Sequence, residues 1–134
     1  MLRPNSIVEK GNWGRLCKME AERPLEKTFE RIRQKEFPDR PSRLNCIFLC
    51  PSLESIKFFI SSTGRKQDLI YEVELVDSNA TTFETDWTLV NEKILDTEEK
   101  REAAARKYWN PISVEEKRKE ILADSAVRIL RHIS

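Results

Sequence analysis

The stretch Cys46-Ile47-Phe48-Leu49-Cys50-Pro51-Ser52 joins one of the longest apolar runs of the chain to a proline and a serine. Apolar residues without a polar interruption over this length are typical of a strand that is buried on both faces. Ser52 is a favoured N-cap residue, so it predicts the start of a helix that carries Ile56, Phe59 and Ile60 on one side. The segment Ser61-Ser62-Thr63-Gly64 ends that helix. The sequence therefore predicts a strand followed at once by a helix in the middle of the chain.

Upstream of this stretch, the pattern predicts a helix from Arg23-Pro24 to about Phe37. Leu25, Phe29 and Ile32 are spaced i, i+4 and i+7, which places them on one apolar stripe. A proline is tolerated in the first turn of a helix, whereas Pro38 disfavours helical geometry in the residue before it. The helix should therefore end next to this proline, and a stiff basic connector over residues 38–43 leads into the strand.

The remaining elements are assigned from shorter signals. Residues 6–15 predict a short strand that enters a turn bounded by Gly11 and Gly14, and residues 69–76 alternate like a strand. Residues 77–91 predict a turn, a short strand and an exposed loop around Asp86-Trp87. Residues 97–109 predict an alanine-rich helix, which Asn110-Pro111 stops. Ser113 and Glu116 have the spacing of a capping box and predict one more short helix.

The tail allows two interpretations. Either residues 120–122 and 126–133 form strands joined by a turn at Asp124-Ser125, or the whole segment is one continuous helix. We adopt the strands, because Val127, Ile129 and Ile133 alternate with polar residues. The predicted class is then α+β, with a mixed or mostly antiparallel sheet and flanking helices.

Length and composition bound the function. A chain of 134 residues predicts a single domain over residues 1–134. Its 24 Lys and Arg face 23 Asp and Glu, which argues against a non-specific nucleic-acid binder because such proteins need a basic excess. No apolar run approaches the roughly 20 residues of a membrane span, and no apolar signal-peptide segment follows Met1. We therefore expect a cytoplasmic protein without a membrane partner.

Cofactor motifs are sparse. The 3 cysteines form no CxxC pair, and the odd count fits poorly with a disulfide framework. The single histidine argues against a histidine-based zinc site and against a Ser-His-Asp triad, so we expect no metal. With 3 glycines, the chain has no GxGxxG or Walker loop.

Three pieces of the chain carry a resemblance to a known family. They are Asn5-Ser6-Ile7-Val8 to Gly11, the segment Pro41 to Ile56 followed by the strand Tyr71 to Leu75, and Glu120-Ile121-Leu122-Ala123. In this order they resemble small ADP-ribosyltransferase-like domains, a group that includes DarT-type toxins and uncharacterised bacterial and phage proteins. The resemblance implies an enzyme that uses NAD and modifies a macromolecular target, either a protein or a nucleic acid. It implies Glu120 as the catalytic carboxylate and leaves Arg3 as the candidate for the family's early basic residue.

The chemistry of NAD suggests roles for further residues. Arg43 and the helix start at Ser52 would bind the pyrophosphate, since a planar guanidinium and helix N-terminal amides both suit it. Asn12 would contact the nicotinamide amide, and Arg15 lies near it on the same turn. Each residue also has a purely structural interpretation: Arg43 as a surface arginine, Ser52 as a plain N-cap and Asn12 as a turn residue. Glu120 would then belong to the solvated charged run over residues 115–120.

Two other classes of function stay open. The same fold would serve a non-catalytic interaction module that binds a host or cellular protein, and a weaker alternative is a nucleic-acid-binding domain. An enzyme should gather Glu120, Arg43 and Asn12 around one cleft, whereas an interaction module need not.

Overall fold

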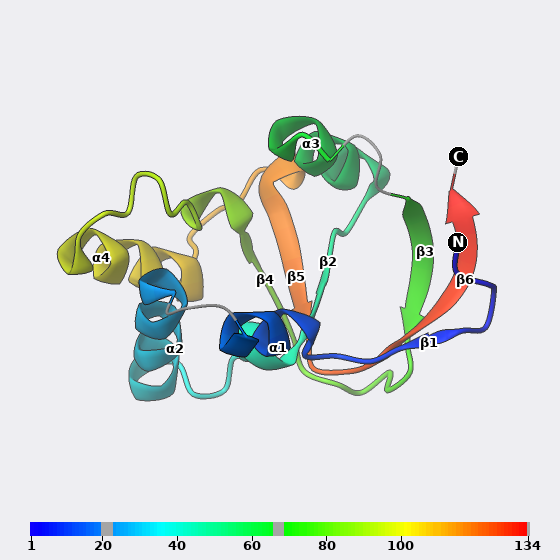
Figure 1. Ribbon diagram of the computed structural model, residues 1–134, viewed down its shortest axis with the longest axis horizontal. Helices are drawn as coiled ribbons and strands as arrows, with labels where there is room; N and C mark the ends of the chain where they lie inside the picture. The colour runs from blue at the N-terminus through cyan, green and yellow to red at the C-terminus, as the bar shows by residue number, and fades with distance from the viewer. Residues whose placement is uncertain (20–22, 66–68, 134) are drawn as a thin grey trace.

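Two antiparallel three-stranded sheets organise the computed structural model, which describes residues 1–19, 23–65 and 69–133 (Figure 1). One sheet has the strand order β1-β6-β3 and the other has the order β2-β5-β4. The strands are β1 (Ile7–Val8), β2 (Ile47–Leu49), β3 (Ile70–Leu75), β4 (Thr82–Asp86), β5 (Lys119–Ala123) and β6 (Val127–Ile133). The architecture confirms the predicted α+β class.

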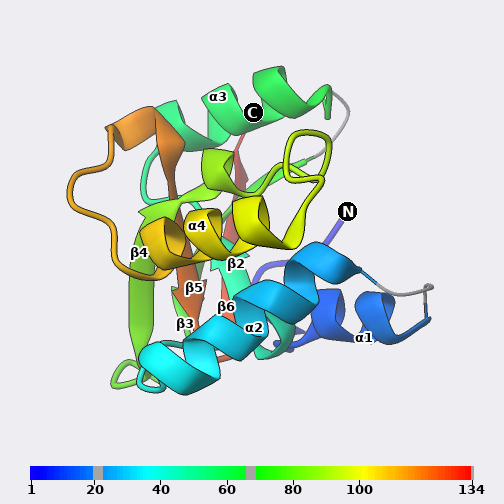
Figure 2. The same ribbon diagram turned by 90° about the vertical axis from the view of Figure 1, so that its left-hand side faces the viewer.

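Helices surround the two sheets. Their bounds are α1 (Asn12–Met19), α2 (Pro24–Glu36), α3 (Leu53–Thr63) and α4 (Glu98–Trp109), with 3-10 turns η1 (Arg43–Asn45), η2 (Trp87–Leu89) and η3 (Glu116–Arg118). Helices α2 and α4 pack together and cover one face of the β2-β5-β4 sheet (Figure 2). Helix α3 contacts η3, and α1 contacts η1.

The core lies under α2 and α4. The predicted apolar stripe of α2 is confirmed, because Leu25, Phe29 and Ile32 are all buried. Trp109, at the end of α4, is also fully buried, and its indole N–H donates to the Phe29 carbonyl at 2.9 Å. Leu122 of β5 completes this cluster from the sheet. The core therefore fixes both helices on the sheet whose central strand is β5.

The strand and helix predicted in the middle of the chain, β2 and α3, both form, with one difference from the prediction. Ser52 caps α3 in a reciprocal capping box with Ser55, and Gly64 ends the helix in a left-handed conformation at φ 74°. Strand β2 is shorter than expected and half-buried, because it pairs only with β5 and lies at the edge of its sheet.

The turn predicted after Gly11 is wrong, because the chain enters α1 there. Gly11 does turn the chain, with φ 92°, but Gly14 lies inside the helix. A Cβ on Gly14 would stand 1.9 Å from the carbonyl oxygen of Leu44. This glycine therefore allows α1 to pack closely on η1 and does not break the helix.

The capping box predicted at Ser113 is also wrong. The chain forms only the three-residue turn η3, whose N-cap position is Glu115, with no side-chain cap. Strand β5 begins directly afterwards at Lys119, which leaves no room for a helix. The Glu116 carboxylate pairs instead with Lys119 at 3.3 Å.

The tail forms two strands, which excludes the continuous helix. Strands β5 and β6 are adjacent in the chain, yet they belong to different sheets and do not pair with each other. Each is the central strand of its sheet.

Candidate functional site

Glu120 and Arg43 meet in a buried cluster beside α2 and α4. Arg43 Nη1 donates to Glu120 Oε2 at 3.1 Å. The exposed fraction of the side chain is 9% for Arg43 and 12% for Glu120. Two of the candidate residues from the sequence, Arg43 and Glu120, are thus in direct contact.

Arg43 has further acidic and aromatic partners. Its Nε and Nη2 atoms donate to Glu26, and its Nη1 atom donates to the Tyr108 hydroxyl at 2.7 Å. The guanidinium also lies 4.9 Å from the centre of the Phe48 ring. Because every nitrogen of the guanidinium already donates to a protein group, Arg43 serves chiefly to hold these side chains together.

Tyr108 closes the cluster. Its hydroxyl donates to Glu120 Oε2 at 2.6 Å. Its own carbonyl accepts a hydrogen bond from Thr85 Oγ1, and Thr85 is the residue of β4 that faces Glu120 in the strand register. The end of α4 and the start of β5 are therefore fixed to each other at Glu120. Arg43 and Tyr108 both donate to Oε2, and Oε1 of Glu120 accepts no hydrogen bond within the described parts of the chain.

Burial and charge act in opposite directions on these groups. Burial raises the pKa of Glu120 above its ordinary value, although the Arg43 charge and the Tyr108 hydrogen bond oppose this shift. Burial also raises the pKa of the Tyr108 hydroxyl well above its ordinary value, so this group remains a donor near neutral pH.

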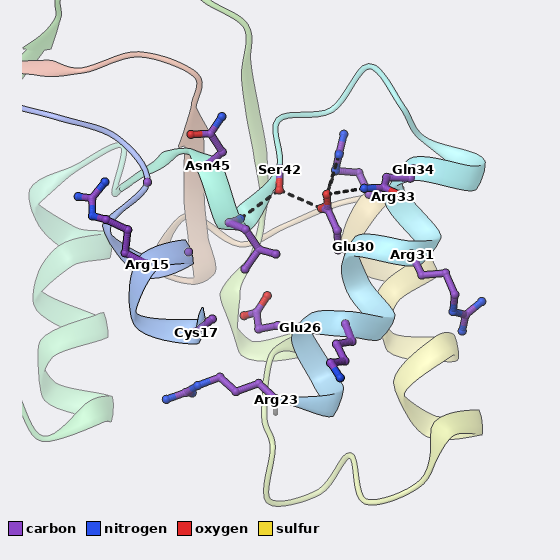
Figure 3. Close-up of a pocket in the computed structure, with 14 residues that line it drawn as sticks. Arg15, Cys17, Arg23, Glu26, Glu30, Arg31, Arg33, Gln34, Ser42 and Asn45 are labelled. Carbon is purple, nitrogen blue, oxygen red and sulfur yellow. Dashed lines mark hydrogen bonds and ion pairs between the residues drawn. The ribbon is translucent and has the colours of Figure 1, made fainter. Parts of the chain in front are cut away.

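A pocket of about 1010 Å³ lies next to the cluster, between α1, α2 and η1 (Figure 3). Glu26 belongs both to the pocket wall and to the buried cluster. The Trp13 indole N–H donates to the same carboxylate at 2.9 Å. Arg43 and Glu120 do not line the pocket, and Arg43 links Glu26 of the pocket wall to Glu120.

The other predicted site residues are dispersed. Arg15 lines the pocket, whereas Asn12 is an exposed residue at the start of α1 and does not line it. Ser52 caps α3, and a hydrogen bond from its side chain helps to lower the pKa of Glu116. Arg3 is exposed in the N-terminal segment. The structure brings together Glu120 and Arg43 but not Asn12, Ser52 and Arg3.

Two residues of the cluster were not anticipated. Glu26 directly follows Leu25 and lies one helical turn before Phe29, so it borders the apolar stripe of α2. A carboxylate at the edge of an apolar stripe is the sequence signal that could have pointed to this residue. Tyr108 lies near the end of α4, within the helix predicted over residues 97–109. No sequence pattern links its hydroxyl to Glu120, because that contact depends on how α4 packs on the sheet.

None of the helices within residues 1–19, 23–65 and 69–133 has the length and apolar character needed to cross a bilayer. In the same residues, no group of three His, Cys, Asp or Glu side chains is placed to hold a metal ion.

The fold and the site define a small α+β domain with a buried Arg–Glu–Tyr cluster beside a pocket. Residues 15–134 match the family described as Protein of unknown function (DUF2441), and the chain therefore belongs to that family. No curated protein matches the chain.

Proposed function

We propose that this domain is an NAD-dependent ADP-ribosyltransferase, or a closely related NAD-using enzyme, with Glu120 as its catalytic carboxylate. The observation that carries the proposal is the fixed position of Glu120. One carboxylate oxygen is held by Arg43 and Tyr108, and the other accepts no hydrogen bond from the described residues. The proposal includes action in the cytoplasm on a macromolecular target, either a protein or a nucleic acid.

The proposed reaction needs a fixed negative charge. The bond between nicotinamide and ribose breaks, its electron pair leaves with nicotinamide, and positive charge develops on the sugar. A carboxylate beside that sugar stabilises the cation until a nucleophile of the target attacks and loses its proton. Arg43 and Tyr108 would keep Glu120 ionised and oriented during this step.

The proposed role of Arg43 differs from the one expected from the sequence, which was to bind the pyrophosphate of NAD. Arg43 already donates to Glu26, Glu120 and Tyr108, so in the proposal it positions Glu120 and leaves the pyrophosphate to other groups. Contacts of NAD with Asn12, Arg15, Ser52 and Arg3 stay predictions.

The test compares matched carboxylate variants. The chain and its E120Q and E84Q variants are incubated with radiolabelled NAD and a cell lysate, and both label transfer and free nicotinamide are measured. Glu84 is the control because it is an exposed carboxylate on β4, the strand paired with β5. We expect E84Q to retain activity and E120Q to lose at least about a hundredfold, as for other preorganised electrostatic groups. Circular dichroism checks that both variants are folded.

Two outcomes contradict the proposal. One is equal activity of E120Q and the unmodified chain. The other is no nicotinamide release under any condition, which would leave the non-catalytic interaction module as the better account. A melting temperature that does not move in excess NAD would count against NAD binding by this domain, since a ligand at a hundred times its Kd adds about 2.7 kcal/mol of stability.

A further inference from the structure

Among the described residues, more cationic than anionic side chains line the pocket between α1, α2 and η1. Its volume of about 1010 Å³ is large enough for a nucleotide. The charged side chains that line it are the cations Arg15, Arg23, Lys27, Arg31 and Arg33 and the carboxylates Glu26 and Glu30. The cations come from α1, from α2 and from the residue just before α2.

Both carboxylates of the wall are engaged by protein groups. Glu26 accepts hydrogen bonds from Arg43 and Trp13. Glu30 accepts two from Arg33, at 2.9 and 2.8 Å, and one from Ser42. Arg33 pairs with Glu30, and Arg43 shares its charge between Glu26 and Glu120, so neither wall carboxylate is available to a cationic ligand. Two cations of the wall are also engaged by carboxylates, Arg23 by Glu92 and Arg31 by Glu98 and Glu102.

Arg15 and Asn45 are the donors that protein groups engage least. Arg15 comes from α1 and Asn45 from η1, and both side chains lie beside Gly11. A Cβ added to Gly11 would stand 3.6 Å from Arg15 Nη1 and 3.3 Å from Asn45 Oδ1. The guanidinium of Arg15, an exposed residue, donates only to the Lys10 carbonyl, at 3.5 Å, and pairs with no carboxylate of the described chain. The Asn45 side chain makes no hydrogen bond to any described residue. Figure 3 shows both side chains at the same end of the pocket.

We propose that this pocket binds the diphosphate group of a nucleotide-sized ligand, with Arg15 and Asn45 as its principal donors. A guanidinium presents a planar fork that matches phosphate oxygens, and an amide adds a neutral donor beside it. The volume exceeds that of a single phosphate and leaves room for a nucleoside. The proposal does not depend on the chemistry at Glu120, because Glu120 does not line the pocket.

Isothermal titration calorimetry with ADP, inorganic pyrophosphate and adenosine tests the proposal at low ionic strength. We expect ADP and pyrophosphate to bind and adenosine to bind much more weakly. R15A should weaken ADP binding by at least roughly tenfold, since a hydrogen bond to a charged group is lost. R15K should fall between R15A and the unmodified chain, because it keeps the charge and loses the fork.

The matched control is R118A. Arg118 is also exposed, lies on η3 and does not line the pocket. We expect R118A to bind ADP like the unmodified chain. Equal losses in R15A and R118A would indicate non-specific attraction to a cationic surface and would overturn the proposal, as would undetectable binding of ADP and pyrophosphate. Tighter binding of a single-stranded oligonucleotide than of ADP, with the same sensitivity to R15A, would also overturn it in favour of a polynucleotide site.

The E120Q variant separates this inference from the proposed function. It should bind ADP normally, because it leaves the pocket wall intact. Normal ADP binding without any NAD breakdown would contradict only the enzyme, whereas NAD breakdown that is insensitive to R15A and to added ADP would contradict only the pocket.

Discussion

Arg43 is the residue on which the buried cluster depends. Its single positive charge faces two carboxylates, Glu26 and Glu120, in a region with little access to water. Taking charges out of water is costly, and the cost is offset only when the charges remain paired and hydrogen-bonded. The cluster therefore contributes more to the order of the site than to net stability.

Removing Arg43 should be strongly destabilising. In R43M, both carboxylates would stay buried without their cation, and we expect the free energy of unfolding to fall by about 3–5 kcal/mol. Urea denaturation followed by circular dichroism measures the change. The control is R128M, which breaks the exposed pair Arg128–Glu74 and should cost about 0–1 kcal/mol. Similar losses in the two variants would contradict the description of Arg43 as a buried cation.

Cys46 should resist alkylation in the folded protein. Burial raises the pKa of its thiol to about 12, and burial likewise raises the pKa of Cys50 to about 11. The thiolate is the reactive form, so iodoacetamide at pH 8 should modify Cys46 much more slowly in the native protein than in urea. Peptide mass spectrometry gives the rate at each cysteine. Equal rates in native and denatured protein would show that this thiol is accessible.

At this scale the sequence predicts part of the site. The family resemblance points to Glu120 and the chemistry of NAD points to Arg43, and the two side chains are in contact in the structure. Glu26 and Tyr108 could not be paired with them from the sequence, because Arg43 reaches Glu26 across 17 residues and Tyr108 across 65 residues of chain. Only the packing of α2 and α4 on the sheet brings these groups together.

Helix α2 is tied to the connector that follows it through Glu30. Its carboxylate accepts hydrogen bonds from Nε and Nη2 of Arg33 and from the hydroxyl of Ser42, the N-cap of η1. Burial alone would raise the pKa of Glu30, but the hydrogen bonds from Arg33 and Ser42 outweigh this effect and hold the pKa below its ordinary value. The ionised form therefore stabilises the folded state.

The pH dependence of stability follows from that shift. The contribution of Glu30 is fully present above about pH 4.5 and is lost as the pH falls through the lower pKa of the folded state. We expect the urea midpoint to fall less between pH 6 and pH 3 in E30Q than in the unmodified chain. E9Q is the control, because Glu9 is exposed and has no ion pair among the described residues. An equal pH response in E30Q and the unmodified chain would contradict this role.

Elements with clear end signals were predictable, and elements defined by close packing were not. Helices α2 and α3 begin and end where Pro24, Phe37, Ser52 and Gly64 indicate. Helix α1 was missed because Gly14 reads as a turn residue in the sequence. A glycine is needed at position 14 because the carbonyl of Leu44 lies beside it. This is a tertiary contact between residues 30 positions apart, which the sequence does not reveal.

At the scale of the whole molecule, the packing of α1 on η1 shapes the pocket. G14A would place a methyl group 1.9 Å from the Leu44 carbonyl oxygen, so α1 must move away from η1. We expect a loss of more than about 3 kcal/mol, as for other overpacked sites, together with weaker ADP binding. Thermal denaturation and calorimetry measure the two effects.

G64A is the matched control for this change. Gly64 has a positive φ of 74°, but no atom lies within 4 Å of the added Cβ. The cost should be only about 1–2 kcal/mol, from the left-handed backbone, with ADP binding unchanged. A smaller loss in G14A than in G64A would contradict the close approach of α1 and η1.

The two sheets share one further property, which concerns how the protein is made. Residues 119–133 supply the middle strand of both, and Ile7 near the start of the chain pairs with Arg128 near its end. During translation, β1, β2, β3 and β4 therefore leave the ribosome as edges without a centre. Neither sheet can assemble until β5 and β6 emerge, so the four earlier strands stay unpaired in the growing polypeptide until residues 119–133 are made and close both sheets.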